Sequence, residues 1–363
     1  MSIIHQIGLS FIDTVGPVSS KILLEHFGTA EAVFGAGKND LLAIEGIGAV
    51  MTAQILSGKA LLAAEQQLKF IEKNKIRPLF FTDPEYPARL KQCHDAPVLL
   101  YYKGTASLNH ERMLSVVGTR MATAYGKNLC AELAEALRPY NVLVVSGLAY
   151  GIDVAAHRES LKHQIPTVGV LGHGLDRIYP HLHKETAYNM LKNGGLLTEF
   201  PIHTKPEKGN FPRRNRIIAG ISDATLVVEA TLKGGALITA ELANSYHKDV
   251  YTFPGRVNDL CSQGCNYLVK TNRAALISSA DDLLVNLGWE SLGKKKIFHQ
   301  ASLFPDLSAE ERKIIEILKT GTALIDDIGL KTALPQNRLS VLMFNLEMLG
   351  IVTVLPGKRY QLN

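Results

Sequence analysis

The residues best suited to chemistry are a group of cations around one aromatic ring in the stretch EFPIHTKPEKGNFPRRNRIIAG, residues 199–220. Its charged residues are five cations and two carboxylates: Lys205, Lys208, Arg213, Arg214, Arg216, Glu199 and Glu207. Positive charge beside the ring of Phe211 suits a flexible polyanion whose bases can stack, such as a single nucleic-acid strand. The alternative is a solvated basic loop with Phe211 in the core, but the density of Arg, Lys and Phe favours the first interpretation.

A helix beginning inside this basic stretch would position the cations. Leu196 and Leu197 precede the stretch and the apolar residues 217–219 end it, which predicts a strand, a long loop and then a helix. Pro212 suits the first helical turn, because its missing N–H needs no partner there. Arginines near a helix N-terminus are unfavourable by roughly 0.3–1 kcal/mol each. Their presence predicts a bound anion, for which a helix N-terminus is already a site.

The overall composition predicts a globular protein without a metal site or a membrane segment. A length of 363 residues suggests two or three domains, and 46% hydrophobic residues can fill their cores. A net charge of +5 is too small to prove a polyanionic partner, so its local concentration is the better signal. The cysteines have no zinc-ligand spacing and no nearby His: Cys93, Cys130, Cys261 and Cys265. Without a signal peptide or a bilayer-length apolar run, we expect a soluble, cytoplasmic protein.

Residues 1–75 are predicted to form a small helical domain of the SAM or helix-hairpin-helix kind, because they lack strand alternation and are rich in Ala, Leu, Ile and Lys. Helices are expected over residues 18–27, 30–34, 39–42, 49–56 and 59–74. The turn Gly46-Ile47-Gly48 resembles a helix-hairpin-helix turn, whose backbone N–H groups can bind phosphate. Such turns also simply pack two helices together, and packing is the favoured interpretation.

Residues 78–285 are predicted to form an α/β core with a parallel sheet. Apolar runs rich in Val, Leu and Ile span residues 97–102, 114–118, 142–147, 167–172, 194–200, 224–230 and 249–255. Crossover helices are expected over residues 125–138, 153–164, 184–193, 213–221 and 236–247. Near-continuous apolar strands that alternate with helices imply a parallel sheet covered on both faces.

The polar loops of this core fall where the predicted strands end, the edge at which such sheets bind ligands. Besides the basic stretch, they span residues 118–120, 146–153, 172–180, 229–236 and 254–266. Glycines there let a backbone approach phosphates, and Arg or Lys supplies charge. The cations expected on this rim are Arg120, Lys208, Arg213, Arg216, Lys233 and Arg256. One bound nucleotide would need fewer cations, so repeated phosphates are favoured.

No cofactor motif or catalytic arrangement accompanies these loops. Gly172 and Gly174 lack the third glycine of the dinucleotide fingerprint, and the phosphate-binding loop of ATPases is absent, so no cofactor is expected. Asp153 is interpreted as a helix N-cap, with catalysis as the minority alternative. Four histidines are interpreted as capping, packing or surface residues: His157, His173, His181 and His183.

Strings throughout the core resemble the bacterial DNA processing protein A family, also called DprA or Smf. They are SVVGTR, SGLAYGIDVAAH, GVLGHGLDRIYP, TEFP…FPRRNRIIAG, ATLVVEA…LITA and FPGR…SQGCNYL, in family order. The resemblance implies a non-catalytic protein with an extended Rossmann-like core between a small helical N-terminal domain and a small C-terminal one. It also implies binding and protection of single-stranded DNA in natural transformation, loading of the RecA recombinase, and a homodimer formed through the core.

The family motifs also assign roles to individual residues. Arg120 matches an arginine that contacts the DNA backbone, Lys208 matches a DNA-binding lysine, and Phe211 matches an aromatic residue that contacts a base. Asn215 and Arg216 belong to the same motif and would order the turn or touch phosphate. The resulting single-stranded-DNA site comprises Gly118, Thr119, Arg120, Gly147, Lys208, Phe211, Arg213, Asn215, Arg216, Lys233 and Gly234.

Two segments depart from the family pattern. The usual EFPPGT is EFPIHT here, with Ile202 and His203 in place of Pro and Gly. The usual Ser-Gly-Ser-like loop is replaced by residues 233–236, KGGA, so a serine contact to phosphate is lost and Lys233 is the candidate substitute. The family places the dimer contact plausibly near Leu268, Val269 and Ile277.

Residues 286–306, which include the lysines 294–296, are predicted to be a linker, and residues 307–363 a winged-helix-like domain. Ser308 and Glu311 form a capping box that opens a helix to about residue 319. Helices over 324–331 and 335–350 follow, then a hairpin that turns at residues 356–357. The third helix supplies few cations for a major groove. A protein-interaction role is therefore favoured, with Lys358 and Arg359 as wing contacts to DNA.

Two other functions stay open from the sequence. The first is a nucleotide-processing phosphoribohydrolase-like enzyme on the same scaffold, although EATLKGGALITAE lacks the Pro and Thr of that family's P-G-G-x-G-T-x-x-E loop. The second is a transcription regulator that acts through the winged helix, which would leave the basic stretch unexplained.

Overall fold

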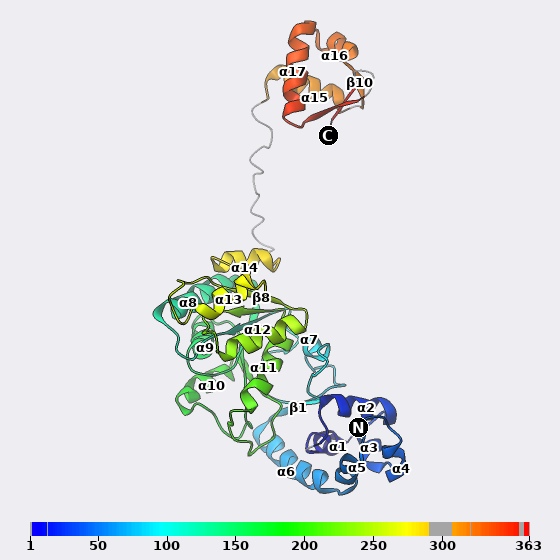
Figure 1. Cartoon of the computed structure of the whole chain (residues 1–363), viewed down its shortest axis with the longest axis vertical. Coiled ribbons are helices and arrows are strands. Elements are labelled where there is room, and N and C mark those ends of the chain that lie inside the picture. The colour runs from blue at the N-terminus through cyan, green and yellow to red at the C-terminus, as the bar shows by residue number, and fades with distance from the viewer. Residues whose placement is uncertain (1, 13, 290–306, 320, 356–358, 363) are drawn as a thin grey trace. The chain divides into compact units, whose positions relative to one another are not determined.

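The computed structural model describes residues 2–12, 14–289, 307–319, 321–355 and 359–362. The chain divides into two compact units, Met1–Glu290 and Ser291–Asn363, and each is described by itself (Figure 1). No helix within the described ranges is both long enough and apolar enough to span a bilayer.

The first unit is built on a mixed, mostly parallel sheet with strand order β1-β2-β6-β5-β4-β3-β7-β8-β9. Its strands are β1 Arg77–Phe80, β2 Leu99–Gly104, β3 Arg112–Val117, β4 Val142–Ser146, β5 Thr167–Val170, β6 Gly194–Thr198, β7 Ala224–Val227, β8 Asp249–Thr252 and β9 Ala275–Leu276. Strands β3 to β9 run parallel, whereas β1 and β2 are antiparallel to their neighbours. The predicted parallel sheet is confirmed for β3 to β9, and the apolar run 97–102 joins it as the antiparallel strand β2, because an apolar run does not encode strand direction.

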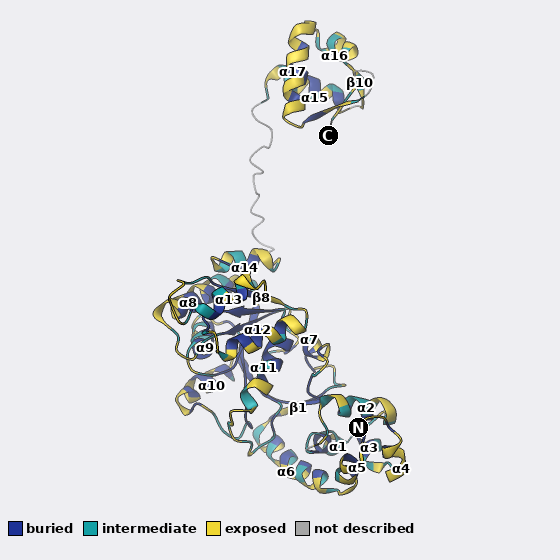
Figure 2. Cartoon of the chain, viewed as in Figure 1, coloured by how far each residue is buried: buried dark blue, intermediate teal, exposed yellow. Residues whose placement is uncertain are grey.

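Helices cover both faces of the sheet, as the alternating pattern predicts. One face packs against α7 Ala88–Lys91, α11 Asn210–Ile221, α12 Gly235–Ser245 and α13 Gln263–Lys270. The other packs against α8 Ala124–Leu137, α9 Ile152–Lys162 and α14 Ala280–Asn286, with α10 Lys184–Met190 beside them. Strands β4 to β7 are buried throughout, whereas the edge strand β9 is exposed, and the helices expose their outer sides (Figure 2). The apolar core on the face covered by α8, α9 and α14 continues to Trp289, beyond the predicted domain boundary at residue 285.

The described N-terminal residues are helical from α1 to α6, and Figure 1 shows these helices grouped together. They are α1 Ile3–Leu9, α2 Pro17–Phe27, α3 Ala30–Gly35, α4 Lys38–Leu42, α5 Ala49–Leu56 and α6 Lys59–Asn74. Their apolar core continues onto the sheet through Phe80, Leu99 and Tyr101 of β1 and β2. These helices therefore share a core with the antiparallel edge of the sheet. Gly46, in the turn between α4 and α5, has a φ of 85°, a left-handed value that favours glycine.

The second unit is the predicted winged helix. Ser308 and Glu311 form the expected capping box at the start of α15 Ala309–Leu318. The remaining elements are β10 Ala323–Leu324, α16 Ile325–Thr332, α17 Gln336–Met348, β11 Val352–Leu355 and β12 Arg359–Leu362, with sheet order β10-β12-β11. The predicted hairpin turn at 356–357, Lys358, and the predicted linker from residue 290 onward lie outside the described residues.

Candidate nucleic-acid interface

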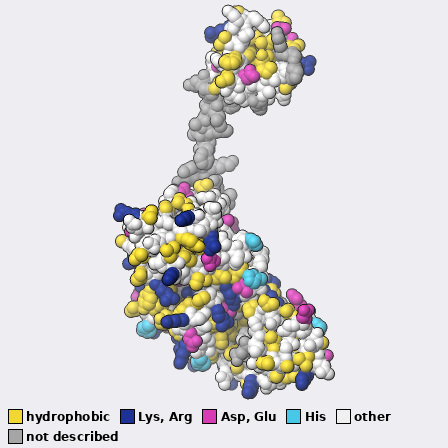
Figure 3. All heavy atoms as spheres, in the orientation of Figure 1, with side chains coloured by type: hydrophobic (Ala, Val, Ile, Leu, Met, Phe, Trp, Pro, Cys, Tyr) yellow, Lys and Arg dark blue, Asp and Glu magenta, His cyan; other side chains and the backbone are white. Residues whose placement is uncertain are grey.

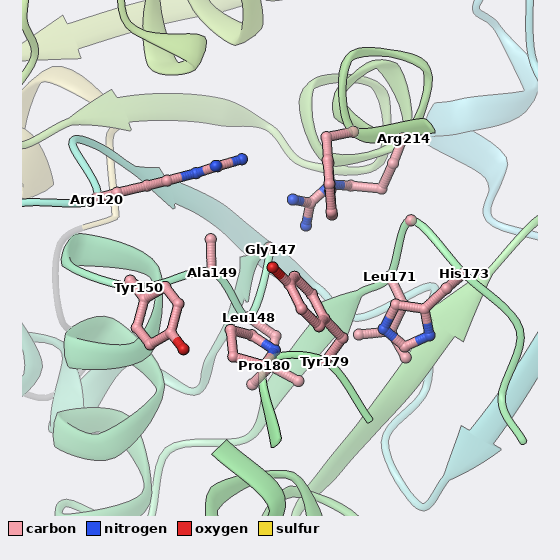
Figure 4. A pocket seen from close by; sticks show the side chains of 12 residues that line it. Arg120, Gly147, Leu148, Ala149, Tyr150, Leu171, His173, Tyr179, Pro180 and Arg214 are labelled. Carbon is pink, nitrogen blue, oxygen red and sulfur yellow. The ribbon is translucent and has the colours of Figure 1, made fainter. Parts of the chain in front are cut away.

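The carboxyl ends of β3, β4 and β5 meet the first turn of α11 around a small cavity of about 70 Å³. Its lining is Arg120, Gly147, Leu148, Ala149, Tyr150, Leu171, Gly172, His173, Tyr179, Pro180, Phe211 and Arg214. Figure 4 shows Arg120 and Arg214 pointing into this space from two sides, with Tyr150 and Tyr179 near its mouth. We call it the rim pocket. Because parallel strands end together, residues far apart in the sequence are brought to one edge.

Arg120 and Phe211 meet at this pocket, although 90 residues separate them in the sequence. The guanidinium carbon of Arg120 lies 5.4 Å from the centroid of the Phe211 ring, within cation–π range. The ring of Tyr179 lies 6.2 Å from the Phe211 ring, centroid to centroid, at an interplanar angle of 33°. An exposed arginine and two aromatic rings are thus grouped as base stacking and phosphate binding require.

The predicted backbone residues Gly118, Thr119 and Gly147 are held by packing under the pocket. The Thr119 N–H donates to the carbonyl of Glu229 at 2.7 Å, so it is already used. A Cβ on Gly118 would lie 2.5 Å from the Ile152 side chain, and one on Gly147 would lie 2.1 Å from Nη1 of Arg214. Both glycines are required because neighbouring groups approach their Cα atoms closely.

Arg214 is an arginine of the pocket that the sequence interpretation left out of the site, as it left out Tyr150 and Tyr179. It is buried, and its Nη1 donates to the carbonyl of Val170 at the end of β5, at 2.5 Å. Burial lowers the pKa of Arg214 to about 10, and the nearby carboxylate of Asp153 opposes this shift. Arg214 lies on the same helix side as Ile217 and Ile218, both fully buried. An arginine on the apolar face of a helix was the sequence signal for a buried cation.

Asp153 is the counter-charge of Arg214 rather than the predicted N-cap. Helix α9 begins at Ile152, with Gly151 as its N-cap, two positions earlier than a cap at Asp153 would need. The Asp153 carboxylate accepts a hydrogen bond from the Ala149 N–H at 3.3 Å. Burial raises the pKa of Asp153, and the Arg214 guanidinium opposes that rise.

The buried histidines near the pocket pack, as predicted, against backbone and hydroxyl groups. Nδ1 of His157 lies 2.7 Å from Oγ1 of Thr167, and burial lowers the pKa of His157 to about 3. Nδ1 of His183 lies 2.9 Å from the carbonyl of Leu148. Burial also lowers the pKa of His173. His181 is exposed.

Arg216 is buried, which corrects its expected place on the rim. Its guanidinium forms an ion pair with Glu199 and donates to the carbonyl of Asp95. Burial raises the pKa of Glu199, and Arg216 opposes that rise. Of the two roles that the motif implied, the geometry of Arg216 fits ordering the turn and not touching phosphate.

The other predicted site residues lie around α11 but do not line the rim pocket. Lys208 is exposed in the loop before α11. Arg213 is exposed on another side of the helix, with its guanidinium carbon 5.3 Å from the centroid of the Phe200 ring. Asn215 donates to the Gly235 carbonyl at 3.4 Å and ties α11 to α12. Lys233 and Gly234 line a separate depression with Leu232, Leu237, Ile238, Glu241 and Tyr267.

On the face shown in Figure 3, Lys and Arg side chains of the first unit are interspersed with hydrophobic ones. Across the described residues, no three His, Cys, Asp or Glu side chains are grouped to hold a metal ion.

The fold and site define a class of protein: an extended Rossmann-like α/β unit with cations and aromatic rings at its ligand edge, joined in sequence to a winged helix. Residues 77–288 match the family model of the DNA recombination-mediator protein A, and residues 300–358 match that of the DprA winged helix domain. The chain therefore belongs to the DprA/Smf family of DNA-processing proteins.

Relatives agree with this assignment over most of the chain. The protein Smf of Synechocystis sp. is 35% identical, over 97% of this chain and 96% of the relative. The solved structure of DNA processing protein A from Streptococcus pneumoniae matches with a TM-score of 0.65 and 29% identity, over 78% of this chain and 98% of that one. The Helicobacter pylori protein, solved to study its single-stranded DNA binding mode, matches with a TM-score of 0.54 and 29% identity, over 59% of this chain and 95% of that one.

Proposed function

We propose that this protein binds single-stranded DNA across the carboxyl edge of its sheet, with the rim pocket as the centre of the site. The observation that carries the proposal is the meeting of Arg120, Phe211 and Tyr179 at one opening. The arginine would neutralise a phosphate while a base stacks on the Phe211 ring. The single-stranded DNA binding of the Helicobacter pylori relative supports the same assignment.

Arg214 has a supporting role in this proposal. Its buried guanidinium sits beneath the opening and adds positive potential that Asp153 only partly offsets. A cation held in a poorly solvated place is screened less by salt than a surface one. We therefore assign phosphate contact to Arg120, Lys208 and the exposed Arg213, and assign Arg214 to holding the pocket in shape.

The proposal includes a role as a recombination mediator that protects the strand and delivers it to a RecA-type recombinase in natural transformation, as a cytoplasmic homodimer. Membership of the recombination-mediator family supports this role. We propose no catalytic step, because the histidines of the pocket region are buried in packing contacts and Asp153 is committed to Arg214.

The test is fluorescence anisotropy with labelled dT20. We expect Arg120→Ala to weaken binding at least 10-fold and to reduce the salt slope of log K by about 0.7, the value for one lost phosphate contact on a single strand. Arg138→Ala is the matched control, since Arg138 is exposed and precedes β4 at the opposite edge of the sheet. Equal affinities of both variants and the wild type would exclude this site.

Delivery to the recombinase has its own measurement. We expect the wild type to restore the ATPase of RecA on single-stranded DNA coated with single-strand-binding protein, and Arg120→Ala to lose this effect. If the wild type binds dT20 and yet never stimulates RecA, the mediator part of the proposal is wrong while the binding part stands.

A further inference from the structure

A second opening lies on the other side of α11, between the N-terminal helices and the sheet. This groove has a volume of about 670 Å³. The N-terminal part of the chain lines it with residues 10–12 and 15–17, from the end of α1 to the start of α2. The rest of its lining comes from residues 97–99 at the start of β2, from the loop 199–207 after β6, and from Asn210 and Arg213 of α11. We call it the inner groove.

One buried polar atom in the inner groove has no partner. The Glu199 side chain is only 9% exposed, and one of its carboxylate oxygens pairs with Arg216. The other oxygen, Oε1, is buried and accepts no hydrogen bond. Buried acceptors are normally satisfied, and because Glu199 is among the residues that line the groove, a ligand bound there can supply the missing donor. The ligand must therefore present an N–H or O–H group.

The remaining lining suits a flat, partly apolar group attached to an anion. Apolar side chains of Ile12, Val15 and Leu99 line one part, together with the ring of Phe200. Positive charge is supplied by Lys205 and Arg213, both exposed, and the lining carboxylates are Glu207 and Glu199, of which Glu199 is paired with Arg216. A nucleobase with its phosphate combines these properties, because it has an apolar face, an edge with N–H donors, and a negative charge.

The groove and the rim pocket share the first turn of α11. Phe211 lines the rim pocket. Its neighbours Asn210 and Arg213 line the inner groove. A strand that crosses this turn passes from one opening to the other. We propose that the inner groove is a second nucleotide subsite, in which Oε1 of Glu199 accepts from the exocyclic amino group of cytosine, adenine or guanine. This inference rests on the proposed single-stranded DNA binding and adds a base preference to it.

The test compares dC20 with dT20, because cytosine carries an amino group where thymine carries a carbonyl. We expect the wild type to bind dC20 on the order of 10-fold more tightly, the effect of one hydrogen bond to a charged group. Gly16 offers a clean way to block the groove. A Cβ there meets nothing within 4 Å, and its φ of −79° suits any residue. Gly16→Trp should remove the preference, and Gly16→Ser, a small N-cap residue, should keep it.

Glu199→Gln tests the hydrogen bond itself. The amide oxygen can still accept from Arg216, which turns the amide N–H₂ toward the groove and makes it a donor. We expect the preference to reverse, so that dT20 binds more tightly than dC20. A thermal melt of each variant checks that the fold is kept.

Each outcome decides the inference. Equal binding of dC20 and dT20 by the wild type, or a preference that survives in both Gly16→Trp and Glu199→Gln, would overturn it. Arg120→Ala separates this inference from the proposed function, because it should weaken both oligonucleotides equally and keep their ratio. If Arg120→Ala changes nothing, the rim pocket fails as the centre of the site, while the ratio still reports on the groove.

Discussion

Helices α11 and α17 are the two helices of this protein that are candidates for contact with nucleic acid. Their exposed surfaces differ in chemistry, since one is associated with cations and the other is apolar. Helix α11 begins at the carboxyl edge of the sheet and brings Phe211 to the exposed cation Arg120, while Arg213 is exposed on another side of the helix. Helix α17 is the third helix of the winged helix and exposes the apolar side chains Val341, Phe344 and Met348.

The single cation of α17 does not change this contrast. Arg338 donates to Glu310 of α15 at 2.9 Å, so its charge is already paired. A winged helix is thus not by itself evidence of a DNA reader, since function depends on the side chains at the site and not on the fold. The exposed cations that would bind a polyanion therefore lie in the α/β unit, and a protein-interaction role for α17 stays a prediction.

The largest expected effect concerns stability in the α/β unit. Arg214→Ala removes a buried cation and leaves the carbonyl of Val170 without its donor, and loss of a hydrogen bond to a charged group costs about 1.5–3 kcal/mol. We expect urea denaturation to show a loss of this size. Arg338→Ala, on the exposed side of α17, should cost less than about 1 kcal/mol. Similar losses for both variants would contradict the buried role of Arg214.

A matched pair of aromatic substitutions compares how much α11 and α17 contribute to DNA binding. Phe211→Ala should weaken binding of dT20 by about 1–3 kcal/mol, the value for loss of one base–aromatic stack. Phe344→Ala removes an equally large ring from α17 and should leave the affinity unchanged. Anisotropy at fixed salt measures both. If Phe344→Ala is the more damaging variant, the strand lies on the winged helix instead.

Acid should destabilise the α/β unit through His157. Its folded pKa, about 3, is below the unfolded value near 6.5, so the neutral ring contributes stability that is complete above pH 6.5. That stability is lost as the pH falls toward 3, by about 1.4 kcal/mol per pH unit from this one group. Urea titrations between pH 7 and pH 4 measure the slope.

His157→Gln is the control for this pH effect, since it should flatten the dependence. Residues 307–363 contain no histidine, so the winged helix has no counterpart of this effect. An unchanged slope in the variant would exclude His157 as its source.

The smallest effect on DNA affinity is expected from removal of the Tyr179 hydroxyl. Tyr179→Phe keeps the ring 6.2 Å from Phe211 and removes only the hydroxyl, so dT20 affinity should change by less than about 0.5 kcal/mol. Tyr179→Ala removes the ring and should cost more. Equal effects of both variants would show that the hydroxyl, and not the ring, makes the contact.

Much of the fold could be predicted from the sequence, because buried strands and helices have characteristic patterns of apolar residues. The seven apolar runs correspond to β2 to β8, whereas β1 and β9 were not predicted, and the five expected crossover helices are α8 to α12. The capping box of Ser308 and Glu311 was found because its partners are three residues apart. Strand direction at β2 was missed, since the pairing of Tyr101 with Thr198 joins residues 97 positions apart.

The site shows the same division between local and distant information. The sequence by itself determined that cations, glycines and one aromatic ring stand at the ends of strands, because residue type and spacing are local properties. Only the tertiary structure decided which of these cations face solvent. Arg216 and Arg214 belong to the same motif as Arg213, but the carboxylates near them lie elsewhere. Asp153 belongs to α9, and Glu199 follows β6 at the far end of the basic stretch. Charge is thus encoded locally, whereas its neutralisation depends on distant residues that meet only in the folded chain.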